Sequence, residues 1–384
     1  MGRAFSSGLP LALAMLGATA RAEHVVAPKA SLLDITARRA ELKANRNPRV
    51  TEAVQHLDSC VALPAVPAPT GRMLIPHHYL SGSHGPVNPE EAKITHTYNE
   101  FERRISAGMN QFVANGSHAE ADCAQQQIDT WAQAATLLDY DPKESSQAWF
   151  QVEWTLSSVA IAESVLVNDP ALNQPILQRD IAWMNKVAHR TVDFDKASNQ
   201  RNNHHYWRGL AATAVGVVSS DDDLFTFGLN TFREAVNEID ANGAFPQEMA
   251  RHERAIHYQE FALQPLIPIA EFAERQHIDL DAYKSPTGKT IADAVAFLGR
   301  AVANPSIVKQ YASEDQMVES NARDFYSFAD FYLHRFGINS TTQQLANGMT
   351  APSYASRIGG NTTVLAAPTQ LSTAATTNTS ANTR

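Results

Sequence analysis

The sequence predicts an all-α protein built from antiparallel helix hairpins that are arranged in a ring or a solenoid. From about residue 90 onward, apolar residues recur at helical spacing and are interrupted at short intervals by Asn, Asp, Gly and Pro. The alternating pattern of strands is almost absent from this part of the chain. The helices are too long and too many for one four-helix bundle, which favours hairpins that pack side by side.

The expected helices have similar lengths and short connections. Their predicted ranges are 91–114, 119–138, 144–168, 174–192, 203–219, 222–239, 250–275, 288–303 and 313–336. The preceding segment, residues 64–89, is rich in Pro, Gly, His and Ser and has no helical period, which predicts a long loop. Because long loops in compact domains are often lids, we expect a lid over about residues 70–90.

The N-terminus has the pattern of a secretory signal. Arg3 supplies a positive charge, an apolar run covers residues 9–16, and a small-residue pattern ends at Ala22. We expect residues 1–22 to be a signal peptide cleaved after Ala22, and the mature protein to be periplasmic or secreted. The alternative is a buried N-terminal helix. No stretch reaches the roughly 20 continuous apolar residues of a spanning helix, so no membrane partner is expected.

A single domain is expected after the signal, over residues 23–360. The chain is 44% hydrophobic and contains five Trp, which is ample material for one large core, and no clear linker divides it. Residues 361–384 are rich in Thr, Ser, Ala and Asn, a composition that predicts a disordered tail.

The formal net charge of -9 argues against a nucleic-acid partner, because phosphate binding normally needs a dominant basic surface. An anionic polysaccharide needs only a locally basic cleft. The two cysteines, Cys60 and Cys123, are far apart in sequence. In an oxidising compartment such thiols tend to pair, so we predict a disulfide between them; the alternative is two buried free thiols.

The first polar cluster is NNHHYWR at residues 202–208, where an apolar helical run begins. Helix N-capping explains one Asn or two, but not two His, a Tyr and a Trp side by side. Aromatic rings beside amides and imidazoles typically line a carbohydrate cleft, where the rings stack on sugar faces. We therefore expect Tyr206 and Trp207 to contact a saccharide.

The second cluster is RHERAIHY at residues 251–258, inside a predicted helix. Helical spacing places Arg251, Arg254 and Tyr258 on one face, and we expect Arg254 and His257 to contact the substrate. A solvated surface is the alternative for such a charged face. Guanidinium groups beside a phenol favour its anion, which would let Tyr258 accept a proton near neutral pH.

The two clusters resemble the mannuronate-specific alginate lyases of polysaccharide lyase family 5. That family carries N-N-H-x-Y-W, which reads NNHHYW here, followed by E-x-x-R-x-x-x-x-x-x-Y, which here is Glu248, Arg251 and Tyr258. DSCVALPAVPAPTG, ADCAQQQIDTWAQAATLL, NGAFPQEM and the RIGG at residues 357–360 also resemble family segments. Both cysteines stand at family positions, which supports the predicted disulfide.

The resemblance implies an incomplete α/α toroid with the substrate in a deep groove. It makes Asn203, His204 and Tyr258 catalytic residues and Arg251 the residue that binds the substrate's charge. Arg357 matches a second arginine of the cleft. The family's lid corresponds to the stretch around His78 and Tyr79, which we expect to bind substrate; His78 stands where some members have Lys, so the preferred polyuronate stays open.

β-Elimination on a uronate requires that the carboxylate charge be neutralised, the C5 proton removed and the bridging O4 protonated. Asn203 and Arg251 suit the first task, and His204 can join them or act as a base. In mannuronate the C5 hydrogen and O4 lie on the same side, so Tyr258 can serve both proton transfers. In guluronate they lie on opposite faces, and His204 is available as a separate base. No cofactor is needed.

Other functions fit the sequence less well. No H-E-x-x-H motif or close carboxylate spacing supports a catalytic metal, and none is expected. A glycoside hydrolase would need two opposed carboxylates, and none stands out in an aromatic motif. Two alternatives remain open: a lyase acting mainly on polyglucuronate or hyaluronan-like chains, and a non-catalytic polyuronate-binding protein.

Overall fold

The computed structural model describes residues 23–81 and 84–370, and the predicted signal peptide lies outside them. In this part of the chain, helices account for almost all the regular structure, and one two-stranded hairpin is the exception. The long helices are α3 (Pro89–Asn115), α4 (His118–Gln133), α5 (Ser146–Leu166), α6 (Gln174–Lys196), α7 (Asn203–Ser219), α8 (Asp222–Glu238), α10 (Ala255–Arg275), α11 (Ile291–Ala303) and α12 (Ser327–Phe336). The prediction of an all-α fold is confirmed.

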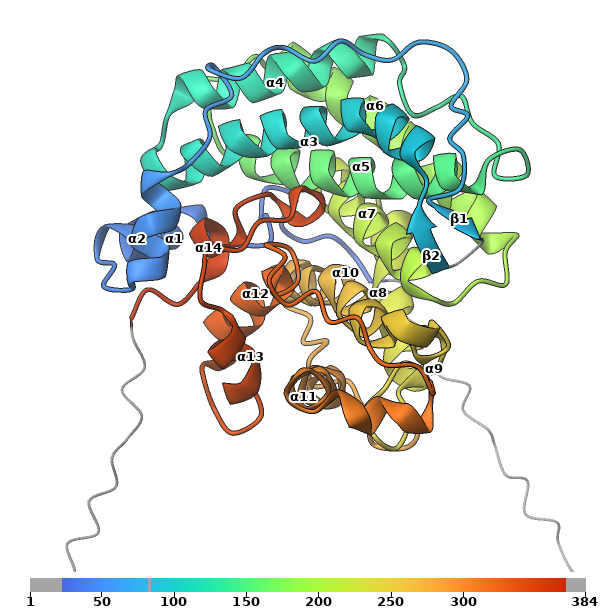
Figure 1. The fold of residues 1–384 in the computed structure, drawn as a ribbon. Helices are drawn as coiled ribbons and strands as arrows, with labels where there is room; N and C mark the ends of the chain where they lie inside the picture. The colour runs from blue at the N-terminus through green and yellow to red at the C-terminus, as the bar shows by residue number, and fades with distance from the viewer. Residues whose placement is uncertain (1–22, 82–83, 371–384) are drawn as a thin grey trace, which may run out of the picture.

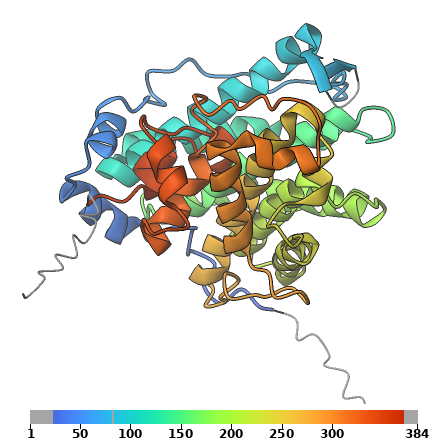
Figure 2. The same ribbon diagram turned by 60° about the horizontal axis from the view of Figure 1, so that its bottom comes forward.

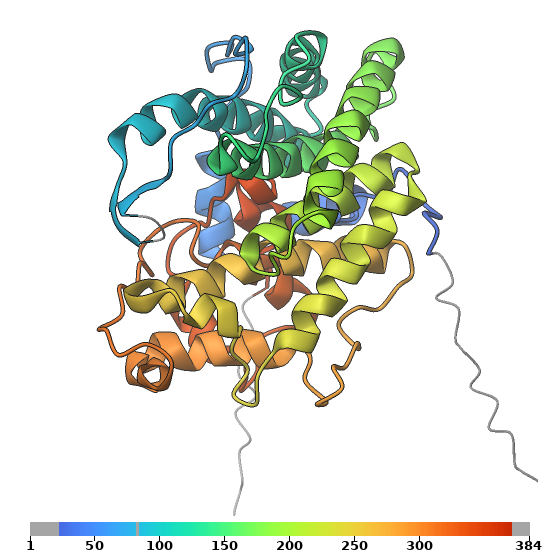
Figure 3. The same ribbon diagram turned by 90° about the vertical axis from the view of Figure 1, so that its right-hand side faces the viewer.

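The long helices form two rows (Figures 1 and 3). In the inner row, α3 packs on α5, α5 on α7, and α7 on α10, while α4, α6 and α8 cover the outside. The inner helices are buried on nearly all sides; α5, for example, exposes almost no side chain. This arrangement is the predicted incomplete toroid of helix hairpins.

Caps fix where the helices begin. The Asn202 side chain accepts a hydrogen bond from the backbone N–H of His204 (3.2 Å) and starts α7 there. Asn88 and Ser145 start α3 and α5 in the same way. These caps matter for function, because the first turn of α7 carries the HHYW segment.

The N- and C-terminal segments differ from the sequence prediction. Helices α1 (Ile35–Lys43) and α2 (Pro48–Gln55) were not predicted, and α14 (Thr362–Ala366) packs against them (Figures 1 and 2). The buried Arg38 donates hydrogen bonds to the carbonyls of Thr363 (3.0 Å) and Val364 (2.8 Å). The predicted start of a disordered tail at residue 361 is therefore wrong, and residues 371–384 lie outside the described part.

The predicted helix at 313–336 is also wrong in its first half. Residues 313–326 form no α-helix, and α12 begins only at Ser327. The backbone of this segment bonds instead to the turn before α10: Met317 N–H donates to the Glu253 carbonyl (2.7 Å). Shorter elements complete the described chain: α9 (Pro246–Met249), α13 (Gln343–Gly348), and the 3₁₀ turns η1 (His252–Arg254), η2 (Pro305–Gln310) and η3 (Ser356–Ile358).

The predicted lid contains a hairpin of strands β1 (Tyr79–Ser81) and β2 (His84–Val87), which the sequence did not indicate. It leaves the N-terminal end of α3 and reaches toward the start of α10 (Figures 1 and 3). The Cys60–Cys123 disulfide is present and ties the segment before the lid to α4, as predicted. Within the described residues, no helix has the length and apolar character needed to cross a membrane.

Candidate active site

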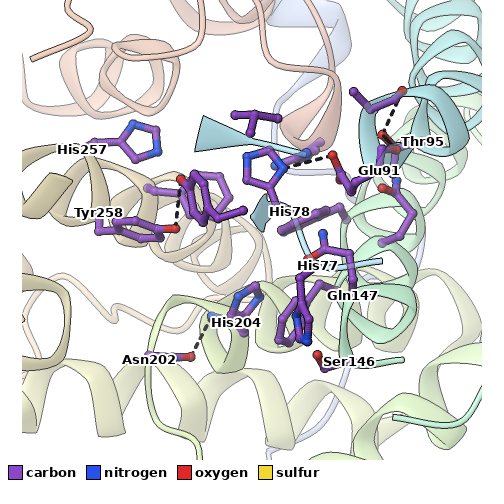
Figure 4. A pocket seen from close by; sticks show the side chains of 18 of the residues that line it. His77, His78, Glu91, Thr95, Ser146, Gln147, Asn202, His204, His257 and Tyr258 are labelled. Atoms are coloured by element: carbon purple, nitrogen blue, oxygen red, sulfur yellow. Dashed lines mark hydrogen bonds and ion pairs between the residues drawn. The ribbon is translucent and has the colours of Figure 1, made fainter. Parts of the chain in front are cut away.

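A cavity of about 560 Å³ lies between the hairpin, α3, α5, the first turn of α7 and the start of α10 (Figure 4). It brings together His78, Tyr79, His204, Arg251, His257, Tyr258 and Arg357, all predicted as site residues. These residues come from segments spread over most of the chain. The convergence of two arginines, two tyrosines and three histidines in one cavity makes it the candidate active site.

His204 stands on the first turn of α7. Its Nδ1 lies 2.6 Å from a carboxylate oxygen of Glu153, and its ring stacks on Phe150 with 3.5 Å between the ring centres. Burial lowers the pKa of His204 well below its usual value, and the nearby Arg208, Arg251 and Arg357 lower it further. The imidazole is therefore neutral near neutral pH.

Tyr258 and Arg251 meet in the cavity. The guanidinium carbon of Arg251 lies 4.3 Å from the centre of the Tyr258 ring. The sequence predicted that Arg251 and Tyr258 share one helix face, and this prediction is wrong. Helix α10 begins at Ala255, and the turn before it contains a positive φ of 53° at His252. This turn, rather than helical spacing, brings Arg251 back over the ring.

The expected lowering of the Tyr258 pKa is wrong for the protein by itself. Burial raises the pKa of this phenol well above its usual value; the neighbouring Tyr79 adds to the increase, and the opposing effect of Arg251 is smaller. The Tyr258 hydroxyl donates a hydrogen bond to that of Tyr79 (3.4 Å). Tyr258 therefore rests as a protonated phenol.

The hairpin closes one side of the cavity. Tyr79 is 7% exposed, and the Arg254 guanidinium carbon lies 5.1 Å from its ring centre. Next to it, Nδ1 of His78 lies 3.1 Å from the Glu91 carboxylate on α3 (Figure 4). Arg254 thus contacts the lid side of the site and does not line the cavity itself.

Arg357 and His257 occupy the remaining wall. The Arg357 guanidinium carbon lies 3.9 Å above the Trp154 ring centre, and burial lowers its pKa while Glu102 opposes this change. His257 lies parallel to Phe261, with 5.9 Å between ring centres, and its Nδ1 is 3.7 Å from Glu319. Both residues lie where the sequence predicted, at the cavity.

Besides Arg254, three predicted residues are not brought to the cavity wall. Tyr206 and Trp207 are 1% and 0% exposed. Two steps of about 100° turn Tyr206 away from His204, whereas Trp207 lies on the same side of α7 as His204 and packs against Phe261, with 5.3 Å between ring centres. Asn203 is also fully buried, and its Nδ2 donates to Glu248 (3.0 Å). The expectation that Tyr206 and Trp207 contact a sugar is not supported by this placement, and Asn203 acts on the cavity only through its neighbours.

Sequence reasoning missed several residues of the site. Glu153, which contacts His204, lies on α5 with Phe150, Gln151 and Trp154 of the cavity wall. The signal was a carboxylate within a largely apolar helical run, which globular cores rarely tolerate without a partner. Asp324, also at the cavity, lay inside the segment wrongly predicted as helix.

In residues 23–81 and 84–370, no group of three or more His, Cys, Asp or Glu side chains is arranged to hold a metal ion. Three histidines of the cavity each face a separate carboxylate: His204 faces Glu153, His78 faces Glu91, and His257 faces Glu319.

Comparison with known proteins assigns the family. The family model for alginate lyases matches residues 36–308. The chain belongs to the alginate lyase family. As a member of this family, it is a polysaccharide lyase.

Individual relatives agree with this assignment. A polysaccharide lyase of Stenotrophomonas maltophilia strain K279a is 28% identical over 264 residues, which cover 68% of this chain and 76% of that protein. Alginate lyase A1-III from Sphingomonas species A1 is 38% identical, with a TM-score of 0.82 over 89% of this chain and 97% of that one. A variant of alginate lyase A1-III with a histidine replaced by alanine, solved with a tetrasaccharide, gives a TM-score of 0.84 at 38% identity over 89% of this chain and 96% of that one.

Proposed function

We propose that this alginate lyase cleaves the 1,4 linkages of mannuronate-type chains by β-elimination and leaves a 4,5-unsaturated uronate end. One observation carries the proposal: Tyr258, Arg251 and His204 face a single cavity, with Arg251 4.3 Å from the ring centre of Tyr258. Two relatives solved with a tetrasaccharide are variants in which a histidine and a tyrosine, respectively, were replaced. Their design supports roles for these residue types in the family.

The cavity can neutralise a uronate carboxylate. Arg251 and Arg357 are its two permanent cations, and both line it. A guanidinium directed at the C6 carboxylate stabilises the dianion that develops as the C5 proton leaves. Asn203 contributes by holding Glu248, whose carboxylate lies 3.8 Å from Arg251 Nε. We assign Asn203 a positioning role and Arg251 direct contact with the charge.

Tyr258 is the proposed proton carrier. Tyr258 first loses its own proton to solvent. As the phenolate it takes the C5 proton; the C4=C5 double bond forms, the C4–O4 bond breaks, and the phenol returns the same proton to O4, which regenerates the phenolate. Its raised pKa makes the phenolate a stronger base toward the C5 proton and the phenol a weaker acid toward O4. Arg251 stabilises the phenolate required for the first step, although burial outweighs this effect in the protein by itself. Because one group serves both transfers, the same-side geometry of mannuronate fits best.

The test is the ultraviolet absorbance of the unsaturated product, with chelator present, on polymannuronate, polyguluronate and polyglucuronate in turn. We expect the fastest rise with polymannuronate. Faster cleavage of polyglucuronate would favour the alternative, a lyase that acts mainly on polyglucuronate or hyaluronan-like chains. Faster cleavage of polyguluronate would assign proton removal to His204.

A matched pair of phenol variants tests the role of Tyr258. Tyr258→Phe is expected to lower kcat by about 10³-fold or more while oligosaccharide binding persists, since only the proton carrier is lost. Tyr79→Phe, which removes the neighbouring hydroxyl, should cost far less. Equal losses in the two variants, or full activity of Tyr258→Phe, would contradict the assignment.

Export is part of the proposal. The Cys60–Cys123 disulfide suits an oxidising compartment, and the N-terminal pattern predicts removal of residues 1–22. Mass spectrometry of the protein recovered outside the cytoplasm should give Glu23 as the first residue. An intact N-terminus on that protein would contradict cleavage after Ala22.

A further inference from the structure

A buried polar chain extends from His204 away from the cavity. One oxygen of Glu153 lies 2.6 Å from His204 Nδ1, and the other accepts a hydrogen bond from Arg208 (2.8 Å). Arg208 also donates to Asp195 (2.6 Å), whose second oxygen lies 2.9 Å from His205 Nδ1. Glu153, Arg208 and Asp195 are at most 1% exposed. The fold maintains three buried ionisable groups directly behind one imidazole.

Arg208 holds Glu153 in its ionised form. Burial raises the pKa of Glu153, and the charge and hydrogen bond of Arg208 oppose this rise, with a smaller opposing effect of Arg357. Arg208 is always a cation, and it donates directly to Glu153 (2.8 Å). On the far side of Arg208, hydrogen bonds to Asp195 and Glu234 overcome the effect of burial and raise the pKa of His205. Protonation of Glu153 would leave buried Arg208 with Asp195 alone, which His205 shares.

An ionised Glu153 fixes the tautomer of His204. A carboxylate only accepts hydrogen bonds, so the nitrogen that it faces, Nδ1, must carry the proton. Nε2, on the opposite edge of the ring, then presents a lone pair on the side where His204 lines the cavity. The ring cannot rotate freely because it is stacked on Phe150.

We propose that Glu153 is a positioning residue that holds His204 with Nε2 toward the cavity and makes it take up a proton when a uronate binds. The proton comes from solvent, adds to Nε2 and forms an imidazolium between the Glu153 and substrate carboxylates. This inference rests on the proposed binding of a uronate in this cavity.

The charged groups around His204 support this coupling of uronate binding to proton uptake. Arg251, Arg357 and Arg208 repel a proton on His204 in the protein by itself. A uronate carboxylate beside Arg251 and Arg357 offsets that repulsion, while Glu153 stabilises the new charge from behind. The Tyr258 phenol is protonated, because burial raises its pKa, and it does not oppose the proton on His204. The site thus gains a third positive charge only when an anionic sugar is present.

Titration calorimetry in buffers of different ionisation enthalpy counts the protons taken up on binding. With Tyr258→Phe and a mannuronate tetrasaccharide, we expect uptake approaching about one proton per bound molecule near neutral pH. Adding Glu153→Gln should abolish most of this uptake, because the imidazolium loses its counter-charge. Adding Asp195→Asn is the matched control: it removes the other carboxylate on Arg208, does not touch His204 and should leave the uptake in place.

Each outcome is decisive. Binding without proton uptake overturns the inference and leaves the proposed function intact, whereas the absence of binding contradicts the placement of the uronate itself. Loss of uptake in both carboxylate variants would assign the effect to the stability of the network and not to Glu153. If Glu153→Gln does not fold, His204→Gln in the Tyr258→Phe background replaces it, and uptake that persists there overturns the proposal.

Discussion

His204 and His205 are neighbours in sequence and face a carboxylate in the same way, yet His204 is neutral and His205 is charged. Nδ1 of His204 lies 2.6 Å from Glu153, and Nδ1 of His205 lies 2.9 Å from Asp195. The pKa of His204 is lowered well below its usual value, whereas that of His205 is raised. The partner type is therefore not what sets the protonation state of these side chains.

The other charged groups around each imidazole decide the difference. Around His204, burial and three arginines oppose the proton, and the single carboxylate does not compensate. Around His205, burial also opposes the proton, but both ring nitrogens face carboxylates, with Glu234 3.2 Å from Nε2. A step of one residue along α7 thus separates a neutral group that can react from a charged group that holds the helix in place.

The same substitution at the two positions should separate catalysis from stability, and the larger effect is expected at His204. His204→Gln removes the ionisable group of the cavity wall and should lower kcat/KM on polymannuronate by about 10²–10⁴-fold. Its melting temperature should stay close to that of the wild type, since the position faces a cavity. A loss of stability as large as the loss of activity would contradict the division of roles.

His205→Gln should have the second largest effect, and on folding. Asp195 and Glu234 would lose a charged hydrogen-bond partner in a position where the native side chain is only 3% exposed. We expect unfolding in urea to show a loss of about 2–3 kcal/mol, typical of hydrogen bonds to charged groups. The kcat of the folded fraction should change by only a few fold. An inactive but stable variant would place His205 in the catalytic machinery.

This pair also shows which parts of the site a sequence can predict. Helical spacing located α3 to α8 because their apolar faces repeat regularly, and the N-cap Asn202 located the first turn of α7. From that start, a rotation of about 100° per residue places Tyr206 about 200° from His204 and Trp207 only about 60° from it. The rotation does not reveal which direction points to the cavity, so the two aromatic residues were placed at the substrate although they belong to the core.

Features that depend on tertiary contacts were not predictable. The positive φ at His252 brings Arg251 over Tyr258, and no spacing rule anticipates such a turn. Residues 313–326 do not form the predicted helix. The Met317 backbone N–H bonds instead to Glu253, in the turn before α10, a partner that is distant in sequence. Glu153 was overlooked for the same reason: its partners, His204 and Arg208, are about fifty residues away.

The smallest expected effect concerns Glu234, the more exposed of the two carboxylates that face His205. It depends on how the protonation of His205 changes stability with pH. Because its folded pKa is raised, His205 contributes stability that is fully present below the unfolded pKa, about 6.5, and is lost as pH rises through the folded pKa. The stability difference between the wild type and His205→Gln should therefore be constant below about pH 6.5 and shrink at higher pH. Chemical unfolding measured across this range checks the direction.

Glu234→Gln should shift that pH dependence. Glu234 is 47% exposed, so its loss should cost only about 0.5–1 kcal/mol, but it supplies one of the two hydrogen bonds that keep His205 protonated. The decline in stability should then begin at a lower pH than in the wild type. Glu274→Gln, which removes a similarly exposed carboxylate from Arg335, is the control and should not move the decline. An unchanged profile in Glu234→Gln would mean that Asp195 alone keeps His205 charged, and the contrast with His204 would then rest on the arginines alone.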